Sequence, residues 1–434
     1  MISAVAAATA GALLLAGCQS GGDEPTTSAD PGTPGAAVAQ DITLWLAGTD
    51  TPDALIDYLK SEYTAENGGT LTVEQIGWGD LIPSLTTALP DPNNTPDVFE
   101  VGNTQSPTFT TVGGFLDITD MYDELGGKSL LDGFVQAGSV GDTIYALPYY
   151  FGSRMVWYRK DIYAAGGQEV PTDLAGYTAV NAALKQQGIG GAYVPGQDWR
   201  GGISWIFANG GDIATFDGST WHASLSSDES IAGMKAWQEL FTTASVAEVT
   251  DDDSTAYQAI NDEFLPGIPA ASTVAPNWAY WSLGDLSVND EGTTVATWND
   301  EKFGAYALPG VNGGVAPVFS GGSNIGISAT TKNVDGAKTL MRIIFSEAYQ
   351  TMLAENGLGP ANLDYSAKYA EVAAMGDISL AVAAEAKLTP AAAGWAAVES
   401  AKLMEQYFQA VAEGGDVASL AAEYDAKIDA LING

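Results

Sequence analysis

The hydrophobic residues of this chain repeat with two alternating periods over its first hundred positions. Alternation at every second residue predicts strands over 42–46, 71–76 and 97–101. A helical period predicts helices between them, the first with an apolar face of Leu55, Ile56, Leu59 and Tyr63 that ends at Gly68-Gly69, and the second over 79–89. Strands and helices in this order are typical of a parallel α/β unit.

The same two periods return further along the chain. They predict strands over 155–158 and 270–275, and helices over 172–187, 227–243, 334–345, 395–413 and 416–432. These spacings fit two α/β lobes joined by a chain that crosses between them more than once, so we expect a hinge and an interlobe cleft. We assign 41–148 plus about 276–316 to the first lobe, and 149–275 plus about 317–434 to the second.

The N-terminal segment has the pattern of a secretion signal. Residues 2–17 carry no charge and are too few to span a bilayer, which takes about twenty residues. We therefore expect a signal peptide over 1–17. Leu15-Ala16-Gly17-Cys18 resembles the bacterial lipobox, which implies cleavage before Cys18 and acylation of its thiol and amino group. The alternative is a small buried cysteine in an N-terminal helix.

Residues 19–40 favour the anchor over the buried cysteine. They are polar and rich in Gly, Pro, Ser and Thr, so they cannot bury enough apolar surface to fold. We expect 18–40 to be a lipidated cysteine followed by a flexible linker. No cysteine follows Cys18, so a domain beyond it depends on its hydrophobic core rather than on a disulfide.

Charge restricts the partners. The chain has 16 Lys and Arg residues against 54 Asp and Glu residues, a formal net charge of −38. Nucleic acid and anionic lipid surfaces would be repelled, so we expect no nucleic-acid partner and a lipid anchor to hold the protein at the extracellular face of the bacterial cell membrane.

Few residues could support metal or acid–base chemistry. His222 is the single histidine and has no nucleophile motif beside it. We interpret it as a surface or core histidine whose ring nitrogens have ordinary hydrogen-bond partners. Asp251-Asp252-Asp253-Ser254 lacks the glycine turn and distal glutamate of a calcium loop, and we interpret it as a solvated acidic loop. We expect no metal site, no cofactor and no catalytic residues.

Several short motifs, in this order, resemble extracellular solute-binding proteins of bacterial ABC sugar importers, the group that includes maltose-binding protein. They lie at Thr95–Val98, Tyr145–Pro148 with Met155–Asp161, Phe207–Gly211, Asn277–Trp281 and Gly321–Ile327. The resemblance covers 41–434. It implies an α/β, two-lobed, type II periplasmic-binding-protein-like fold with interlobe hinge crossovers and a ligand cleft.

The resemblance also implies ligand contacts at particular positions. They are Asn103 and Thr104 after the third strand, Tyr149, Tyr150 and Arg154 after the first crossover, Asp198, Trp199 and Arg200 before the GG segment, Trp278 and Trp281, Gly322 and Asn324, and Trp395. The chain departs from the maltose pattern at Gly152, where an acid is usual, and at Glu100, where an aromatic is usual. Gly321–Asn324 and Gly394-Trp395 are similar to actinobacterial importers of N-acetylglucosamine oligomers.

The resemblance implies a monomeric, non-enzymatic lipoprotein that captures a small-molecule carbohydrate by lobe closure and delivers it to a membrane permease. Eleven Trp and eighteen Tyr residues could supply flat surfaces for sugar rings, although most must be core. We interpret Trp78, Trp205, Trp237 and Trp298 as core or surface residues. Arg154 and Arg200 could donate hydrogen bonds to paired hydroxyl groups or to a carboxylate of the ligand, or else form salt bridges within the protein.

Other functions remain open at this point. One is a secreted glycoside hydrolase with two carboxylates. Another is a binder of peptides, other organic solutes or ferric iron, the last because Tyr149-Tyr150 is similar to a twin-tyrosine iron site, although adjacent strand residues point to opposite faces. A third is a passive surface or adhesion lipoprotein.

Overall fold

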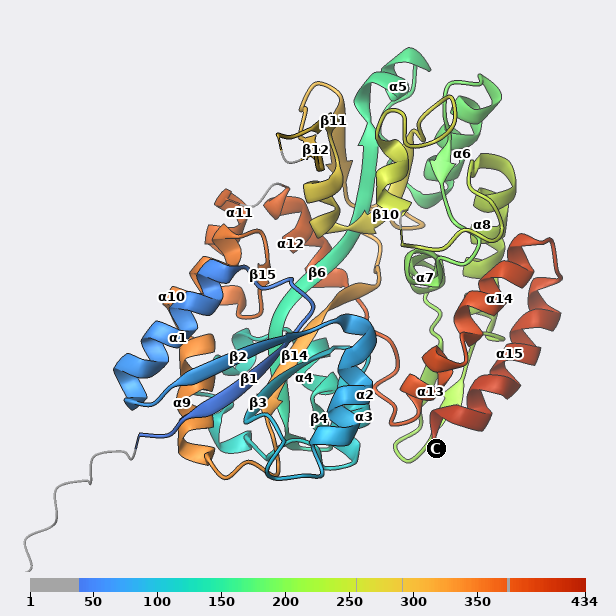
Figure 1. Ribbon diagram of the computed structural model, residues 1–434. Helices are drawn as coiled ribbons and strands as arrows, with labels where there is room; N and C mark the ends of the chain where they lie inside the picture. The colour runs from blue at the N-terminus through green and yellow to red at the C-terminus, as the bar shows by residue number, and fades with distance from the viewer. Residues whose placement is uncertain (1–38, 255, 291, 373–374) are drawn as a thin grey trace, which may run out of the picture. The chain divides into compact units, whose positions relative to one another are not determined.

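The computed structural model describes residues 39–254, 256–290, 292–372 and 375–434 (Figure 1). Val38–Gly434 forms one compact unit. The expected signal peptide, Cys18 and nearly all of the expected linker lie outside the described residues. Within the described residues, no helix combines the length and the apolar character needed to cross a membrane.

The first lobe begins with the alternating strands and helices that the sequence predicts: β1 (Ile42–Ala47), α1 (Asp53–Asn67), β2 (Leu71–Ile76), α2 (Trp78–Ala88) and β3 (Val98–Gly102). β1 pairs in parallel with β2 on one side and β3 on the other. α1 ends at Gly68, whose φ of 80° is in the left-handed region that glycine adopts without a steric penalty.

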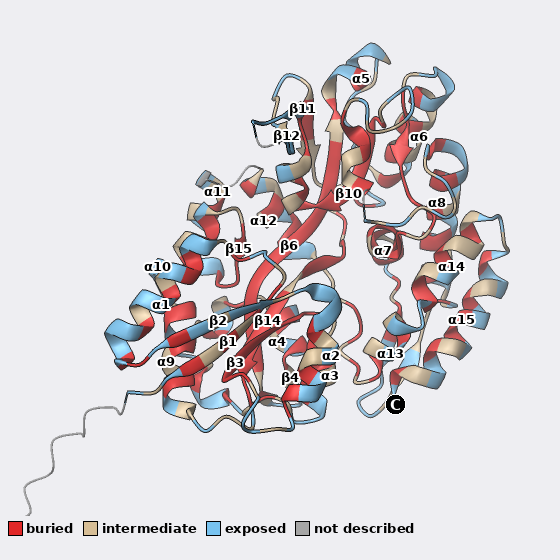
Figure 2. Ribbon diagram, in the orientation of Figure 1, coloured by how far each residue is buried: buried red, intermediate tan, exposed pale blue. Residues whose placement is uncertain are grey.

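Shorter elements connect β3 to the first crossover. They are α3 (Ser106–Thr111), two 3-10 turns at Thr119–Met121 and Gly127–Ser129, α4 (Asp132–Ala137), β4 (Ser139–Val140) and β5 (Thr143–Ile144). Apolar side chains cover both faces of the first sheet. Leu44 and Leu46 pack with α1, while Phe99 and Val101 pack with Leu81 of α2. β3 is buried along its length, whereas β2 is largely exposed (Figure 2).

The 14-residue strand β6 (Ala146–Arg159) joins the two lobes (Figure 1). Its first half pairs with β14 (Ser320–Ile327) and β15 (Gly359–Pro360). Its second half pairs with β10 (Ser272–Pro276) and β13 (Phe303–Tyr306). The strand is buried along nearly all of its length, and β14 returns beside it to pair with β3.

The second lobe is built mainly from helices around β6, β10 and β7 (Ala192–Tyr193). Before β10 the chain forms α5 (Lys160–Ala165), α6 (Leu174–Gln186), α7 (Trp199–Ala208), the hairpin β8 (Ala214–Phe216) and β9 (Trp221–Ala223), α8 (Asp228–Ala244) and the 3-10 helix η3 (Ala256–Ile260). After β10 come η4 (Asn277–Ser282) and the hairpin β11 (Asp285–Val288) and β12 (Thr294–Thr297).

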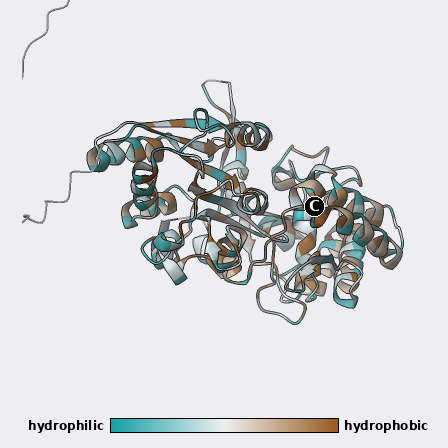
Figure 3. Cartoon of the chain, turned by 90° about the horizontal axis from the view of Figure 1, so that it is seen from below, coloured by the Kyte–Doolittle hydropathy of each residue, from teal (hydrophilic) through white to brown (hydrophobic). Residues whose placement is uncertain are grey.

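The C-terminal helices complete both lobes. They are α9 (Val334–Ile344), α10 (Glu347–Glu355), the 3-10 turn η5 (Leu363–Tyr365), α11 (Ser366–Val372), α12 (Gly376–Glu385), α13 (Trp395–Ser400), α14 (Leu403–Ala412) and α15 (Val417–Ile432). Hydrophobic residues gather where helices meet strands, and hydrophilic residues lie on the outer helix turns (Figure 3). The helix predicted over 395–413 is divided in two at Lys402, whose φ is 53°.

The hydrophobic cores divide the chain differently from the boundaries that we expected. Ile325, Leu340 and Tyr349 pack into the core of the first lobe, because β14 pairs with β3 and α9 packs on α1. Phe303 and Leu308 pack instead with second-lobe residues, because β13 extends the second half of β6. The segment 276–316 thus lies with the second lobe, and 320–360 with the first.

Candidate ligand-binding cleft

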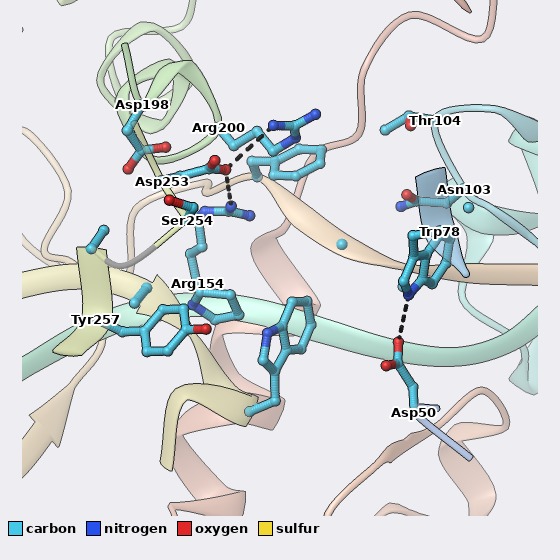
Figure 4. A pocket seen from close by; sticks show the side chains of 18 of the residues that line it. Asp50, Trp78, Asn103, Thr104, Arg154, Asp198, Arg200, Asp253, Ser254 and Tyr257 are labelled. Atoms are coloured by element: carbon cyan, nitrogen blue, oxygen red, sulfur yellow. Dashed lines mark hydrogen bonds and ion pairs between the residues drawn. The ribbon is translucent and has the colours of Figure 1, made fainter. Parts of the chain in front are cut away.

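A cavity of about 900 Å³ is lined by residues from both lobes (Figure 4). The first lobe contributes the loops that follow β1 and β3, the start of α2 and the middle of β6. The second lobe contributes Arg154 from the second half of β6, the start of α7, η3, β10 and η4. The cavity therefore lies where the strands cross from one lobe to the other.

Asp50 organises the first-lobe wall. Its carboxylate oxygen Oδ2 accepts hydrogen bonds from the indole N–H of Trp78 at 3.1 Å and from the hydroxyl of Tyr150 at 3.0 Å. Trp78 also lies against Gly48, where a Cβ atom would come within 2.8 Å of the ring. These contacts hold an aromatic face that is 38% exposed at the edge of the cavity.

Trp278 lies on a floor of glycine backbone. A Cβ atom at Gly152 would overlap a ring carbon of Trp278, and one at Gly321 would lie 3.2 Å from the ring. Gly152 is the position where the maltose pattern has an acid. Here its missing side chain provides the space that the indole occupies, and the neighbouring Trp281 is 52% exposed at the cavity edge.

Charged side chains form the second-lobe wall. Asp253 Oδ2 lies 3.3 Å from Arg200 Nη1 and 3.9 Å from Arg154 Nη2. The guanidinium of Arg154 stacks over Phe319 at 4.9 Å from the ring centroid, and that of Arg200 stacks over Trp199 at 4.6 Å. Asp198 caps α7 by accepting the Gly201 N–H at 2.8 Å.

The second-lobe wall strongly perturbs one of its carboxyl groups. Burial and the nearby Asp253 carboxylate raise the pKa of Asp198 to about 6, although Arg154 and the Gly201 N–H lower it. Burial lowers the pKa of Arg154, although the two carboxylates oppose this shift. An arginine remains protonated throughout the working range of pH, so the wall presents fixed positive charge beside two acids.

A buried carboxyl group lies behind the first-lobe wall. Glu100 of β3 is fully buried and its Oε2 accepts the Ala47 N–H at 2.9 Å. Burial raises the pKa of Glu100 to about 8, while the Ser323 hydroxyl and the Ala47 N–H lower it. Glu100 is therefore mostly neutral at pH 7, and it supports the wall without adding negative charge to it.

Most of the site residues implied by the resemblance line this cavity. The first-lobe elements and strands supply Asn103, Thr104, Tyr150 and Gly322, and the second lobe supplies Arg154, Asp198, Arg200, Trp278 and Trp281. Asn103 donates from Nδ2 to the Ser320 carbonyl at 3.0 Å. Thr104 donates to Glu399 Oε2 at 3.5 Å, a contact between the first lobe and α13.

Two of the expected residues face the core of the first lobe instead. Tyr149 is fully buried, and its hydroxyl bonds to those of Thr51 and Tyr349. Asn324 is fully buried and donates to the Phe134 carbonyl at 2.8 Å. The register of β6 against β14 shifts at Tyr149, and the rings of Tyr149 and Tyr150 are in edge contact with centroids 5.2 Å apart. The Tyr149 hydroxyl is bonded within the core whereas that of Tyr150 donates to Asp50, so the two phenols do not form a twin-tyrosine iron site.

Two further site residues implied by the resemblance, Trp199 and Trp395, lie in the core of the second lobe. Trp199 and Trp395 are buried and pack edge to face with ring centroids 6.0 Å apart. Trp395 is the first residue of α13, and its indole packs on Trp199 in the second-lobe core and does not line the cavity. A tryptophan after glycine resembles a turn residue in the sequence, but long-range helix packing decides its place.

The cavity also includes residues that the sequence did not indicate. Asp50, Tyr257 and Phe319 carry no local motif. Trp78 lies at the cavity edge, although we expected a core or surface role. Asp253 belongs to the acidic run that we interpreted as solvated, and it lines the cavity because two arginines that are distant in sequence pair with it. Within the described residues, no group of His, Cys, Asp and Glu has the arrangement of a metal site.

Comparisons with known proteins agree with this geometry. The sequence profile of the bacterial extracellular solute-binding protein family matches residues 59–378. The diacetylchitobiose-binding protein DasA of Streptomyces coelicolor is 28% identical over 426 residues, which cover 96% of this chain and 94% of that protein. A probable ABC transporter-binding protein of Deinococcus radiodurans is 25% identical over 234 residues, which cover 50% of this chain and 51% of that protein.

Solved structures of low sequence identity share the fold. The sugar-binding protein MalE of Xanthomonas citri superimposes with a TM-score of 0.75 at 18% identity, over 91% of this chain and 97% of that one. A cyclic alpha-maltosyl-1,6-maltose-binding protein of Arthrobacter globiformis superimposes with a TM-score of 0.72 at 16% identity, over 91% of this chain and 99% of that one. The expected two-lobed, type II periplasmic-binding-protein fold is confirmed. The chain belongs to the family of bacterial extracellular solute-binding proteins.

Proposed function

We propose that this protein is the carbohydrate-binding component of an ABC importer and that it captures a short oligosaccharide of the N-acetylglucosamine type. The observation that carries the proposal is the cavity itself, which combines the exposed Trp78 and Trp281 and the partly buried Trp278 with planar polar groups. Sugar rings have apolar C–H faces and a rim of hydroxyl groups, so a sugar site needs both kinds of surface.

The relatives support a sugar and favour one class. DasA is named for binding diacetylchitobiose, a disaccharide of N-acetylglucosamine, and it aligns with nearly the whole of this chain. A volume of about 900 Å³ is at the large end of the range of ligand pockets, which is about 300–1,000 Å³. A disaccharide or a somewhat longer oligosaccharide would fill it better than a monosaccharide.

Capture would follow from lobe closure. The first-lobe residues Asp50 and Trp78 and the second-lobe residue Arg200 line one cavity, so a single ligand can contact both lobes. A ligand that contacts both lobes shifts the population toward the closed form, which the permease would then receive. Family membership supports a permease partner.

Capture requires no covalent step. Asp198 and Asp253 are the acids nearest to each other in the second-lobe wall, but Asp198 caps α7 and Asp253 pairs with Arg200. We therefore infer a binding protein rather than a glycoside hydrolase. Recovery of the sugar unchanged after prolonged incubation with the protein would support this inference, and released monosaccharide would refute it.

Calorimetric titration of the purified chain tests the function. We expect saturable binding of N,N′-diacetylchitobiose and weaker binding of maltose and cellobiose, with a rise in the unfolding temperature that grows with ligand concentration. If no sugar binds while a peptide or ferric iron does, the carbohydrate proposal is wrong. Binding of no small molecule would favour a passive surface protein.

Two aromatic variants test whether the cavity is the sugar site. Trp281→Ala removes a ring that is 52% exposed at the cavity edge, and Phe216→Ala removes one that is 53% exposed on β8, outside the cavity. Loss of stacking should weaken sugar binding about tenfold in the first variant, which is 1.4 kcal/mol. The second should bind like the wild type, and equal losses would argue against this site.

We also infer that the protein is anchored to the outer face of the cell membrane through acylated Cys18, after removal of 1–17. The lipobox-like Leu15–Cys18 and the polar linker composition support this. Labelling with radioactive palmitate in a bacterial host should mark the wild-type chain and not Cys18→Ser. We expect a single copy of the released chain by light scattering, with and without sugar.

A further inference from the structure

Arg154 is a buried cation whose donors are free. Its side chain is 7% exposed, and it lines the cavity from the second half of β6. Its guanidinium donates no hydrogen bond to any residue that the structure describes, and its ion pair with Asp253 is long at 3.9 Å. A guanidinium has five N–H donors, and Arg154 lines the cavity with them, so this arginine is suited to an acceptor supplied by the ligand.

The Phe319 ring limits where those donors can point. The Cζ atom of Arg154 lies 4.9 Å from the centroid of the Phe319 ring, which restricts the guanidinium on that side. On the side of the cavity the guanidinium extends toward Asp253 (Figure 4). Arg200 is less buried, at 34% exposure of its side chain, and pairs with Asp253 at 3.3 Å and with Glu399 at 3.8 Å. The two arginines therefore differ, because Arg200 donates a hydrogen bond to Asp253 whereas Arg154 makes only a longer ion pair with it.

The charge around Arg154 favours a neutral acceptor. Asp253 and the buried Asp198 lie on the same wall, and the Asp50 carboxylate lies on the opposite wall. An anionic ligand would be attracted by two guanidinium groups but repelled by these three carboxylates. An uncharged oxygen, such as an amide carbonyl, gains the charge-assisted hydrogen bond without that repulsion.

Apolar surface next to Arg154 favours an amide with a methyl group over a hydroxyl. Arg154 pairs with Pro276 across β6 and β10, and Val274 lines the cavity on the same strand as Pro276, two residues away. Together with the Phe319 ring, these side chains form an apolar wall beside the guanidinium. A hydroxyl would leave this wall in contact with water, whereas a methyl group would cover it.

We propose that Arg154 determines specificity by donating to the carbonyl oxygen of a 2-acetamido group, whose methyl group packs on Val274 and Phe319. This deepens the proposed sugar-binding function and rests on it. Asp198 or Asp253 can accept from the acetamido N–H, because the N–H and C=O of a trans amide lie in one plane and point in opposite directions. A sugar with a hydroxyl in place of the acetamido group has its acceptor oxygen closer to the sugar ring and has no methyl group, so it would lose both the carbonyl contact with Arg154 and the apolar contact.

The test compares two sugars of the same linkage on two variants. N,N′-diacetylchitobiose carries a 2-acetamido group on each ring, whereas cellobiose carries a hydroxyl group at the same positions. Calorimetry gives the affinity for each sugar. Arg154→Met keeps the length of the side chain and removes its donors. The control is Arg342→Met on α9, where the arginine is 44% exposed and pairs with Glu124 away from the cavity.

We expect Arg154→Met to weaken diacetylchitobiose binding by about 10- to 100-fold, the usual range for a hydrogen bond to a charged group. Cellobiose affinity should stay within error, and the control should match the wild type for both sugars. If Arg154→Met is unstable, Arg154→Lys keeps the charge but not the planar fork, and it should still lose selectivity.

Three results would overturn the proposal, and they separate it from the proposed function. If Arg154→Met lost affinity equally for both sugars, Arg154 would not distinguish an acetamido group from a hydroxyl group. A wild type that prefers cellobiose or maltose would refute the acetamido contact while leaving a sugar-binding protein. A wild type that binds none of these sugars would refute the proposed function itself.

Discussion

The buried carboxyl group of Glu100 makes a quantitative prediction about stability and pH. Its pKa is about 8 in the folded chain, where burial is the main cause, against an ordinary value of 4.5. The folded state therefore binds a proton that the unfolded state has released at every pH between these values. The stability associated with the neutral group is fully present below pH 4.5 and is lost as the pH rises to 8.

The size of this loss follows from the width of the interval. Each pKa unit is worth about 1.4 kcal/mol. The contribution of Glu100 to the free energy of unfolding is therefore about 3 kcal/mol lower at pH 7 than at acid pH, where the group is protonated in both states. Above pH 8 the loss levels off near 5 kcal/mol. Glu100→Gln keeps an oxygen to accept the Ala47 N–H but has no proton to hold, so it avoids the loss.

Denaturant unfolding of both proteins from pH 4.5 to 8.5 measures the effect. The difference in free energy of unfolding between Glu100→Gln and the wild type should grow with pH in favour of the variant. It should increase by about 3 kcal/mol between pH 4.5 and pH 7. Glu74→Gln, an exposed change on β2, is the control for losing one acidic residue. A difference that stays constant over this range would refute the reasoning, because the carboxyl group would then titrate alike in both states.

Three further predictions concern packing and backbone. Gly152→Ala should weaken sugar binding at least tenfold by calorimetry, since its Cβ would displace Trp278, and unchanged affinity would contradict the role given to the glycine floor. Trp395→Ala should lower the free energy of unfolding by about 3–5 kcal/mol in denaturant while leaving affinity unchanged, because the ring fills the second-lobe core. Lys402→Gly should raise the thermal midpoint slightly, by relieving a left-handed backbone worth about 1 kcal/mol; a lower midpoint would show that α13 and α14 depend on the lysine side chain.

The sequence supports the early elements of the fold well, because their apolar periods are local. The strands and helices from Ile42 to Gly102 lie close to their predicted positions. The division of the chain between lobes was harder to predict, since it depends on which half of β6 each later strand joins. That choice is made by pairings such as Ile325 with Glu100, more than 200 residues apart in sequence, which no local pattern records.

The site shows the same contrast. Only Tyr150 of the two neighbouring tyrosines lines the cavity, and strand alternation does not explain the difference, because the register of β6 shifts at Tyr149 and the two rings are in contact. No sequence signal separates Asp253 from its two acidic neighbours, because its position depends on Arg154 and Arg200. Trp395 misleads in the opposite way, since Gly394 before it suggests a turn while α13 carries the ring into the core.

The strand that joins the lobes also sets a length scale for the ligand. Tyr150 and Arg154 lie on the same face of β6, the first beside Asp50 and the second beside Asp253. Four residues of strand at about 3.3 Å each separate them by about 13 Å. The distance is fixed by backbone geometry rather than by the angle between the lobes. If the lobes close on the ligand as proposed, a solute too short to reach from one residue to the other would contact one lobe only, and β6 would favour solutes of a minimum length.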